Sequence, residues 1–319
     1  MVAWVSSIKN SLKLHRASFL LFFISLAAIL MVLLIFPNFT LYWIDHCDAW
    51  FYYGLTYSWR LLQPNIDTSY FDDRLSATLI RASVAKIFEF PKDRYFLAFC
   101  FHWIAIVSFF NLLKSQVSRH SLWAVIVLFA FSPILIGSLH TDYIAIDATV
   151  FLLSSLALNS LYKKEMASKG SLYLVGSGFL LAFDFFTHFK IILYFPLLPL
   201  LYFYETSKLR PHKNWRVIFI GTSLGFLLAT AFLSLFYKFA LDSSFYFFED
   251  QLKQVFLSEG HHKRGVEILF RYAPGILLYP MALWCLCFLD RRKIFHPLVL
   301  LAISQIALIG FFGLVGGNI

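Results

Sequence analysis

Long apolar runs separated by short polar segments dominate the chain of 319 residues. A membrane-spanning helix needs about 20 mainly apolar residues to cross roughly 30 Å of hydrocarbon, and the runs predict about nine such helices. They cover approximately residues 17–37, 95–113, 121–138, 144–162, 171–188, 190–204, 215–239, 271–289 and 295–315. We therefore expect an all-α integral membrane protein in which residues 1–319 form a single polytopic membrane domain.

The first apolar run follows a basic segment that contains Lys9, Lys13 and Arg16. Cleaved signal peptides begin in the same way. This run is long for a signal sequence, and it ends in Phe36-Pro37-Asn38 without a small-residue cleavage site. We therefore expect a retained first helix.

Two longer segments, 38–94 and 240–270, interrupt the apolar runs. Within the first of them, residues 74–90 repeat apolar side chains at helical spacing with Arg74, Arg81 and Lys86 between them. This pattern is typical of an amphipathic helix that lies in the membrane interface.

Composition and charge agree with a membrane protein. Sixty per cent of the residues are apolar and 14% are charged, whereas a soluble domain averages roughly 45–50% and about 25%. The net charge of +9 does not indicate a nucleic-acid partner, because the basic residues lie in short loops between apolar runs. Beyond the N-terminal segment, alternate loops carry Lys114, Arg119, Lys163, Lys164, Lys169, Lys208, Arg210, Lys213, Arg216, Arg291, Arg292 and Lys293. Since cytoplasmic loops are enriched in Lys and Arg, we expect a cytoplasmic N-terminus and extracytoplasmic segments 38–94 and 240–270.

Several common catalytic motifs are missing from the sequence. It contains no Walker or other glycine-rich phosphate loop and no G-x-S-x-G, which disfavours an ATP-driven pump and a serine hydrolase. Cys47, Cys100, Cys285 and Cys287 form no C-x-x-C pair, so they predict neither a zinc site nor a disulfide framework.

Two carboxylates follow the first apolar run in an aromatic stretch, residues 41–54. Asp45 and Asp48 are three residues apart, so on a helix they would share a face. Neighbouring carboxylates at a membrane surface can raise the pKa of one of them, bind a divalent cation, or leave one as a general base. The alternative is an interfacial helix cap within the aromatic belt.

Further polar residues lie near the predicted outer ends of later runs. Asp142 could be the N-cap of the helix that follows it. Asp147 lies within an apolar run, where an ionised carboxylate is costly unless it has a partner. Asp184, His188 and Lys190 could satisfy one another as a structural cluster.

The second outer segment carries basic residues on the side where few are expected. Lys263 and Arg264 lie close together, and Arg271 follows shortly after. Such side chains can bind phosphate, and Arg does so with two parallel hydrogen bonds. A solvated loop and contact with anionic lipid headgroups are the alternatives.

Together these residues resemble the GT-C superfamily of polyprenyl-phosphate-sugar-dependent glycosyltransferases. Its members include protein O-mannosyltransferases, aminoarabinose transferases of lipid A and the catalytic subunit of oligosaccharyltransferase. Asp48-Ala49-Trp50-Phe51-Tyr52-Tyr53-Gly54, with Tyr70 through Arg74-Leu75, is similar to the bacterial-type pattern D-x-W-x-Y-x-G … Y-x-x-x-R-L. Asp142 through Leu158 resembles the family's fourth-span segment.

The resemblance implies inverting transfer of a sugar from a polyprenyl phosphate to a hydroxyl of a lipid, glycan or protein acceptor. It also implies a place among membrane lipids, by preference in a bacterial plasma membrane. Asp48 would take the proton from the acceptor hydroxyl, with Asp45 as the second choice. The basic side chains that would compensate the leaving phosphate are Arg74, Lys190, Lys263, Arg264 and Arg271.

The other candidate residues would contact the acceptor or a metal ion. Asp142 and Asp147, together with Asp45, would orient the acceptor, and His188 belongs to the same substrate site. An optional divalent cation, Mg or Mn, would bind Asp45, Asp48 and Asp142.

Two other classes of protein fit parts of the sequence. A secondary transporter also places charged residues within the membrane, but it usually has a repeated half and charges near the midplane. A polymerase or ligase of lipid-linked oligosaccharides also has many spans and a basic outer loop. It would rely on Arg and His rather than on the motif at Asp48.

The predicted orientation can be tested by labelling Cys47 with a membrane-impermeant thiol reagent in intact cells. Cys100, Cys285 and Cys287 are first replaced, so that only Cys47 can react. We expect labelling without permeabilisation, since Cys47 belongs to an extracytoplasmic segment in this topology. A Cys47 that reacts only after the membrane is opened would contradict the topology.

Overall fold

The computed structural model describes residues 2–35, 75–89, 92–114, 117–132, 135–136, 143–164, 170–187 and 214–241. The helices in these ranges are α1 (Val2–Ile35), α3 (Leu75–Ala85), α4 (Lys92–Leu113), α5 (Arg119–Ala130), α7 (Tyr143–Lys164), α8 (Gly170–Thr187) and α11 (Asn214–Leu241). No strand occurs among the described residues, so the all-α prediction is confirmed for this part of the chain.

Within the described ranges, three helical stretches are long and apolar enough to cross a membrane: Lys92–Leu113, Gly170–Thr187 and Arg216–Phe236. They correspond to the predicted runs that begin near residues 95, 171 and 215. Shorter apolar stretches of described side chains lie in α1, α5 and α7. The runs 190–204, 271–289 and 295–315 lie outside the described residues, so the total of about nine spans stays a prediction.

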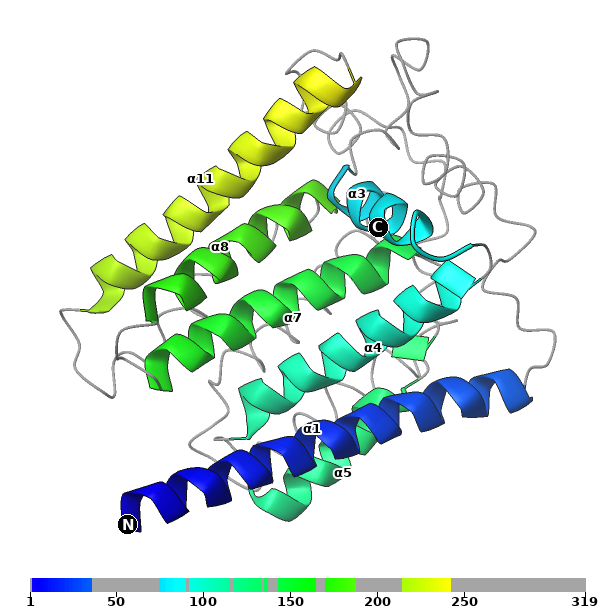
Figure 1. Ribbon diagram of the computed structural model, residues 1–319, viewed down its shortest axis with the longest axis vertical. Coiled ribbons are helices and arrows are strands. Elements are labelled where there is room, and N and C mark those ends of the chain that lie inside the picture. The colour runs from blue at the N-terminus through cyan, green and yellow to red at the C-terminus, as the bar shows by residue number, and fades with distance from the viewer. Residues whose placement is uncertain are drawn as a thin grey trace, which may run out of the picture.

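The long helices lie side by side in the order α11, α8, α7, α4 and α1, with α5 beside α1 and α4 (Figure 1). Along this row α11 and α8 run parallel to each other, α7 and α4 run in the opposite direction, and α1 runs in the same direction as α11 and α8. Helix α3 crosses one end of the bundle, which we call the α3 end (Figure 1). Helices α4 and α7 begin at this end, whereas α1, α8 and α11 end there.

Helix α7 is the central element, because it is apolar on two sides and packs into two clusters of buried side chains. Phe151 and Leu156 join the cluster formed with α3, α8 and α11. Val150 joins the cluster formed with α1, α4 and α5. Helix α7 is therefore packed between two groups of helices.

Small hydroxyl side chains hold α7 against its neighbours. The Ser155 hydroxyl donates to the carbonyl of Ser177 in α8, and the Ser177 hydroxyl donates to the carbonyl of Ser155, each over 2.7 Å. On the other side, the Ser154 and Ser108 hydroxyl oxygens are 3.0 Å apart. Interfaces between membrane helices favour such small polar residues, because they hydrogen-bond across the interface and allow a close approach.

Glycines set the distance between α8 and α11. A Cβ atom added to Gly178 would lie 1.9 Å from the backbone oxygen of Thr222. A Cβ atom added to Gly225 would lie 1.9 Å from the backbone oxygen of Val175. The two backbones therefore touch at two points, and neither position has room for a side chain.

The predicted run 121–138 is not one continuous helix, because α5 ends at Ala130. Residue 133 is proline and has no N–H for the carbonyl of Phe129, which instead accepts from Ser132 N over 3.2 Å. A helix of 12 residues is about 18 Å long, too short to cross the hydrocarbon alone.

Buried His102 of α4 satisfies polar groups at the end of α5. Its Nε2 lies 2.9 Å from the carbonyl oxygen of Ala130, and its Nδ1 lies 2.8 Å from the hydroxyl oxygen of Ser25 in α1. A proton on Nε2 allows His102 to donate to the carbonyl and to accept from the serine. One side chain thus connects three helices through hydrogen bonds that leave neither ring nitrogen unsatisfied.

The outer face of α11 is apolar and exposed. Its large exposed side chains are Val217, Phe219, Ile220, Leu224, Leu227, Leu228, Phe232, Leu235 and Phe239. Soluble proteins rarely expose a continuous apolar surface of this kind, whereas the lipid-facing side of a membrane helix does. The face therefore agrees with contact between α11 and membrane lipid.

The glycine contacts predict a difference between two identical substitutions in α8. Gly178→Ala should lower the melting temperature in detergent, since its Cβ meets backbone atoms and forces the helices apart, at about 1–3 kcal/mol. Gly176→Ala is the matched control, because its Cβ meets only the end of the flexible Leu158 side chain at 3.1 Å. Equal melting temperatures of the two variants would contradict the close packing of α8 and α11.

Candidate functional site

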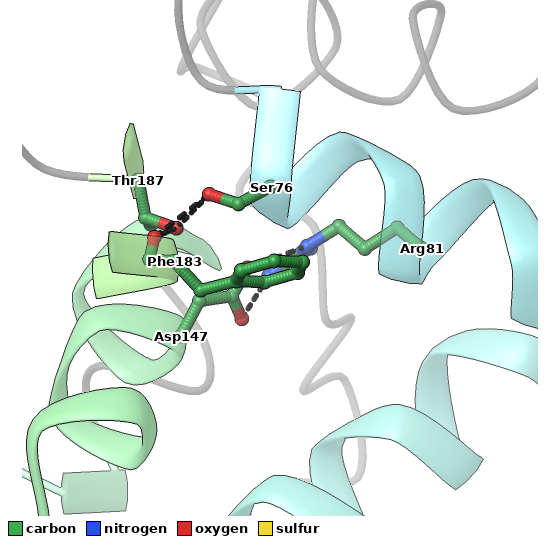
Figure 2. Close-up of polar contacts among 5 residues, drawn as sticks. All are labelled: Ser76, Arg81, Asp147, Phe183 and Thr187. Carbon is green, nitrogen blue, oxygen red and sulfur yellow. Dashed lines mark hydrogen bonds and ion pairs between the residues drawn. The ribbon is translucent and has the colours of Figure 1, made fainter. Parts of the chain in front are cut away.

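A buried ion pair joins α3 to α7. Nε of Arg81 donates to Oδ2 of Asp147 over 3.1 Å, and Nη2 donates to Oδ1 over 2.9 Å (Figure 2). The two side chains are only 8% and 0% exposed. The guanidinium therefore binds both carboxylate oxygens in the bidentate geometry that Arg and carboxylates favour.

This pair supplies the partner that the position of Asp147 requires. A carboxylate within an apolar helix loses its hydration, and an opposite charge must compensate for that loss. The partner comes from a residue 66 positions earlier in the chain. The sequence predicts an amphipathic helix around Arg81, and the helix is found. Arg81, however, faces the bundle instead of a solvated polar surface.

A second set of contacts joins α3 to the end of α8. The Ser76 hydroxyl donates to the carbonyl of Phe183 over 2.8 Å and lies 2.6 Å from the Thr187 hydroxyl (Figure 2). Thr187 also donates to the Phe183 carbonyl over 2.7 Å. Two hydroxyl protons are available for these three short contacts, so two of the three carry a hydrogen bond at any one time.

More charged side chains are buried at the α3 end. Asp93 and Arg94 lie in the first turn of α4, and Nε of Arg94 is 3.8 Å from Oδ2 of Asp93. Asp184, near the end of α8, is 2% exposed. Its Oδ2 atom is buried and has no hydrogen-bond partner among the residues that the structure describes. With Arg81 and Asp147, the buried side chains described at the α3 end include three carboxylates and two guanidinium groups.

Among the predicted site residues, Asp147 alone lies in the described part of the chain, and it pairs with Arg81. The others lie outside the described residues: Asp45, Asp48, Arg74, Asp142, His188, Lys190, Lys263, Arg264 and Arg271. Their roles stay predictions.

Three of these residues, Arg74, Asp142 and His188, are direct sequence neighbours of described helix termini. Arg74 directly precedes Leu75 at the start of α3, and Asp142 directly precedes Tyr143 at the start of α7. His188 directly follows Thr187, the last residue of α8. These three helix termini all belong to the α3 end (Figure 1). A single peptide bond therefore connects each of the three candidates to that end of the bundle.

Several polar residues of this region were not predicted from sequence. Ser76 and Thr187 gave no signal, because single hydroxyl residues are common in membrane helices. Asp93 and Arg94 precede an apolar run, where charged residues ordinarily face water. The usable signals were Asp147 and Asp184, because a carboxylate in an apolar run requires a partner, although the sequence does not identify it.

No metal site is found among the described residues, since no three His, Cys, Asp or Glu side chains come together there. The predicted ligands Asp45, Asp48 and Asp142 lie outside those residues. A divalent cation therefore stays a prediction.

Comparison of the chain with protein-family models, with curated proteins and with solved structures finds no match in any of the three. The resemblance to GT-C glycosyltransferases accordingly depends on the motifs at Asp48, Arg74 and Asp142 alone.

The buried pair predicts a non-additive effect on stability. Arg81→Met leaves the Asp147 carboxylate buried without its guanidinium, which should destabilise the protein by about 3–5 kcal/mol. The double variant Arg81→Met/Asp147→Leu should regain most of this loss, because apolar side chains of similar size can replace a buried ion pair. Melting temperatures in detergent measure both effects.

Lys86→Met is the control, since Lys86 is exposed just beyond the end of α3 and its substitution should change stability little. The losses of stability in Arg81→Met and Asp147→Leu could instead simply add in the double variant. In that case the two side chains would not be coupled.

Proposed function

We propose that the chain is a membrane glycosyltransferase of the GT-C type. It moves a sugar from a polyprenyl-phosphate donor to an acceptor hydroxyl on the extracytoplasmic side of the membrane. The observation that supports the proposal is that Leu75, Tyr143 and Thr187 are helix termini at the α3 end, because Arg74, Asp142 and His188 are their direct neighbours in the sequence. These candidates come from three separate parts of the sequence.

The acidic motif is connected to the same end of the bundle. The chain leaves α1 after Ile35 and enters α3 at Leu75, and both positions belong to the α3 end (Figure 1). Asp45 and Asp48 lie in the segment between these two points. Their attachment at both sides supports a site that combines them with Arg74.

The distribution of charge supports an extracytoplasmic α3 end. Buried Asp93, Asp147 and Asp184 belong to this end together with buried Arg81 and Arg94, so both signs of charge are present there. At the opposite end, four helices begin or finish next to basic residues, namely Lys114, Arg119, Lys164 and Arg216. Because cytoplasmic segments are the basic ones in membrane proteins, this difference favours donor chemistry at the outer surface.

In the proposed reaction, Asp48 accepts the proton of the acceptor hydroxyl while the hydroxyl oxygen attacks the anomeric carbon. A new glycosidic bond forms as the bond from that carbon to the lipid phosphate breaks, with inversion. The bonding electrons leave with the phosphate. The transition state has the character of an oxocarbenium ion. The side chains proposed to stabilise the leaving phosphate are Arg74, Lys190, Lys263, Arg264 and Arg271.

The remaining candidates serve the acceptor. Asp142 and His188 would orient its hydroxyl, with Asp45 beside the base. Asp45, Asp48 and Asp142 are also the side chains that would hold an optional Mg or Mn ion, which supplies further positive charge to the phosphate. Both carboxylate oxygens of Asp147 bind Arg81, which favours an indirect role for Asp147 over contact with the sugar.

A cation- or proton-coupled transporter is the second candidate, and Asp184 favours it. An acidic side chain buried in a candidate span, with one oxygen lacking a hydrogen-bond partner among the described residues, is a common feature of ion and proton pathways. The two candidates differ in a simple respect. A transferase forms product in detergent micelles, whereas a transporter shows activity only across a closed membrane.

The base assignment predicts that Asp48→Asn lowers the turnover number by about 10²–10⁴-fold, while donor binding persists. The asparagine keeps the size of the side chain but cannot accept the proton. Purified protein would be assayed with a panel of polyprenyl-phosphate sugars, with analysis of the products. A helix cap would behave differently, because asparagine caps as well as aspartate.

Turnover near that of the unaltered protein in Asp48→Asn would exclude Asp48 as the base. If Asp45→Asn alone abolished turnover, the mechanism would stand with Asp45, in place of Asp48, as the general base.

A further inference from the structure

We propose that Arg81 and Asp147 are positioning residues for the transferase site. Their buried ion pair, together with the contacts of Ser76, fixes α3 on the ends of α7 and α8 and thereby sets the position at which the chain enters α3 at Leu75, directly after Arg74 in the sequence. The inference rests on the proposed function for its activity readout, but its structural part can be tested independently.

Three attachments determine how α3 lies. Arg81 binds Asp147 of α7, and Ser76 binds the carbonyl of Phe183 in α8 (Figure 2). At its other end, α3 continues into a hydrogen-bonded turn, in which the N–H groups of Ile87 and Phe88 donate to the carbonyl of Val84. Contacts to two helices and a short connection to α4 leave α3 little freedom to rotate or slide.

The contacts of Ser76 lie close in sequence to Arg74, the side chain proposed to bind the phosphate of the donor. Ser76 is the second residue of α3, and Arg74 immediately precedes the helix. Any rotation of α3 would therefore move the point from which the Arg74 side chain reaches the donor.

The chemistry of the pair suits orientation more than stability. A buried ion pair adds little net stability compared with apolar side chains of similar size, because both charges lose their hydration. The bidentate contact, however, permits essentially one relative arrangement of guanidinium and carboxylate. An apolar pair could hold α3 equally firmly but in several registers. The charged pair selects one of them.

The test separates orientation from stability in one set of variants. In Arg81→Met/Asp147→Leu, we expect a melting temperature close to that of the unaltered protein. We also expect a loss of about 10²-fold in kcat/KM for sugar transfer, the size of effect that a displacement of about 1 Å can cause. Arg81→Lys keeps the positive charge but lacks the two parallel N–H donors of the guanidinium group, so it should lose activity as well. Lys86→Met is the matched control and should keep full activity.

Activity that returns together with stability in the double variant would overturn the proposal, since the pair would then serve stability alone. Activity lost in step with a lower melting temperature across all variants would overturn it too. A protein that transfers no sugar before any substitution would exclude the proposed function instead.

A distance measurement tests the same inference without any substrate. Nitroxide labels are attached at Ser83→Cys in α3 and Lys238→Cys in α11, two exposed positions, after the native cysteines are replaced. Electron paramagnetic resonance should give a narrow distance distribution when the ion pair is present. In Arg81→Met/Asp147→Leu the distribution should broaden or shift, and an unchanged distribution would overturn the proposal.

Discussion

The buried carboxylate of Asp147 imposes the requirement that organises one end of this protein. The side chain is fully buried in an apolar helix, where an ionised carboxylate needs a partner. The guanidinium of Arg81, from a distant part of the sequence, meets the requirement, and α3 packs against α7 as a result. Helix α3 is thereby connected to the ends of α7 and α8 through one buried ion pair and the hydroxyl contacts beside it.

The same need to satisfy polar groups away from water explains the other internal contacts. His102 satisfies the carbonyl at the end of α5 and accepts from a serine of α1. Ser155 and Ser177 donate to each other's backbone across the α7–α8 interface. These bonds form where side chains are small, because a large residue at either position would keep the backbones apart. Polar satisfaction and close packing therefore depend on the same residues.

The helices at residues 92–113, 170–187 and 216–236 could be predicted from sequence because their apolar runs are long and uninterrupted. The end of α5 was missed, although Ser132-Pro133 signals it, because the apolar side chains continue past the proline. The site was harder to predict. Asp147 indicated that a partner must exist, but the identity of Arg81 depends on how α3 lies in three dimensions. Gly178 and Gly225 carry no charge or hydroxyl group, so only the packed backbones reveal their role.

The separation of Arg81 and Asp147 along the chain has a consequence for biosynthesis. The chain is made from its N-terminus, so the guanidinium leaves the ribosome 66 residues ahead of the carboxylate that it binds. During that interval α3 has no reason to leave the aqueous or interfacial phase, because burying an uncompensated arginine is unfavourable. Insertion of α7 supplies the missing charge. We therefore expect α3 to dock on the bundle only after α7 has inserted.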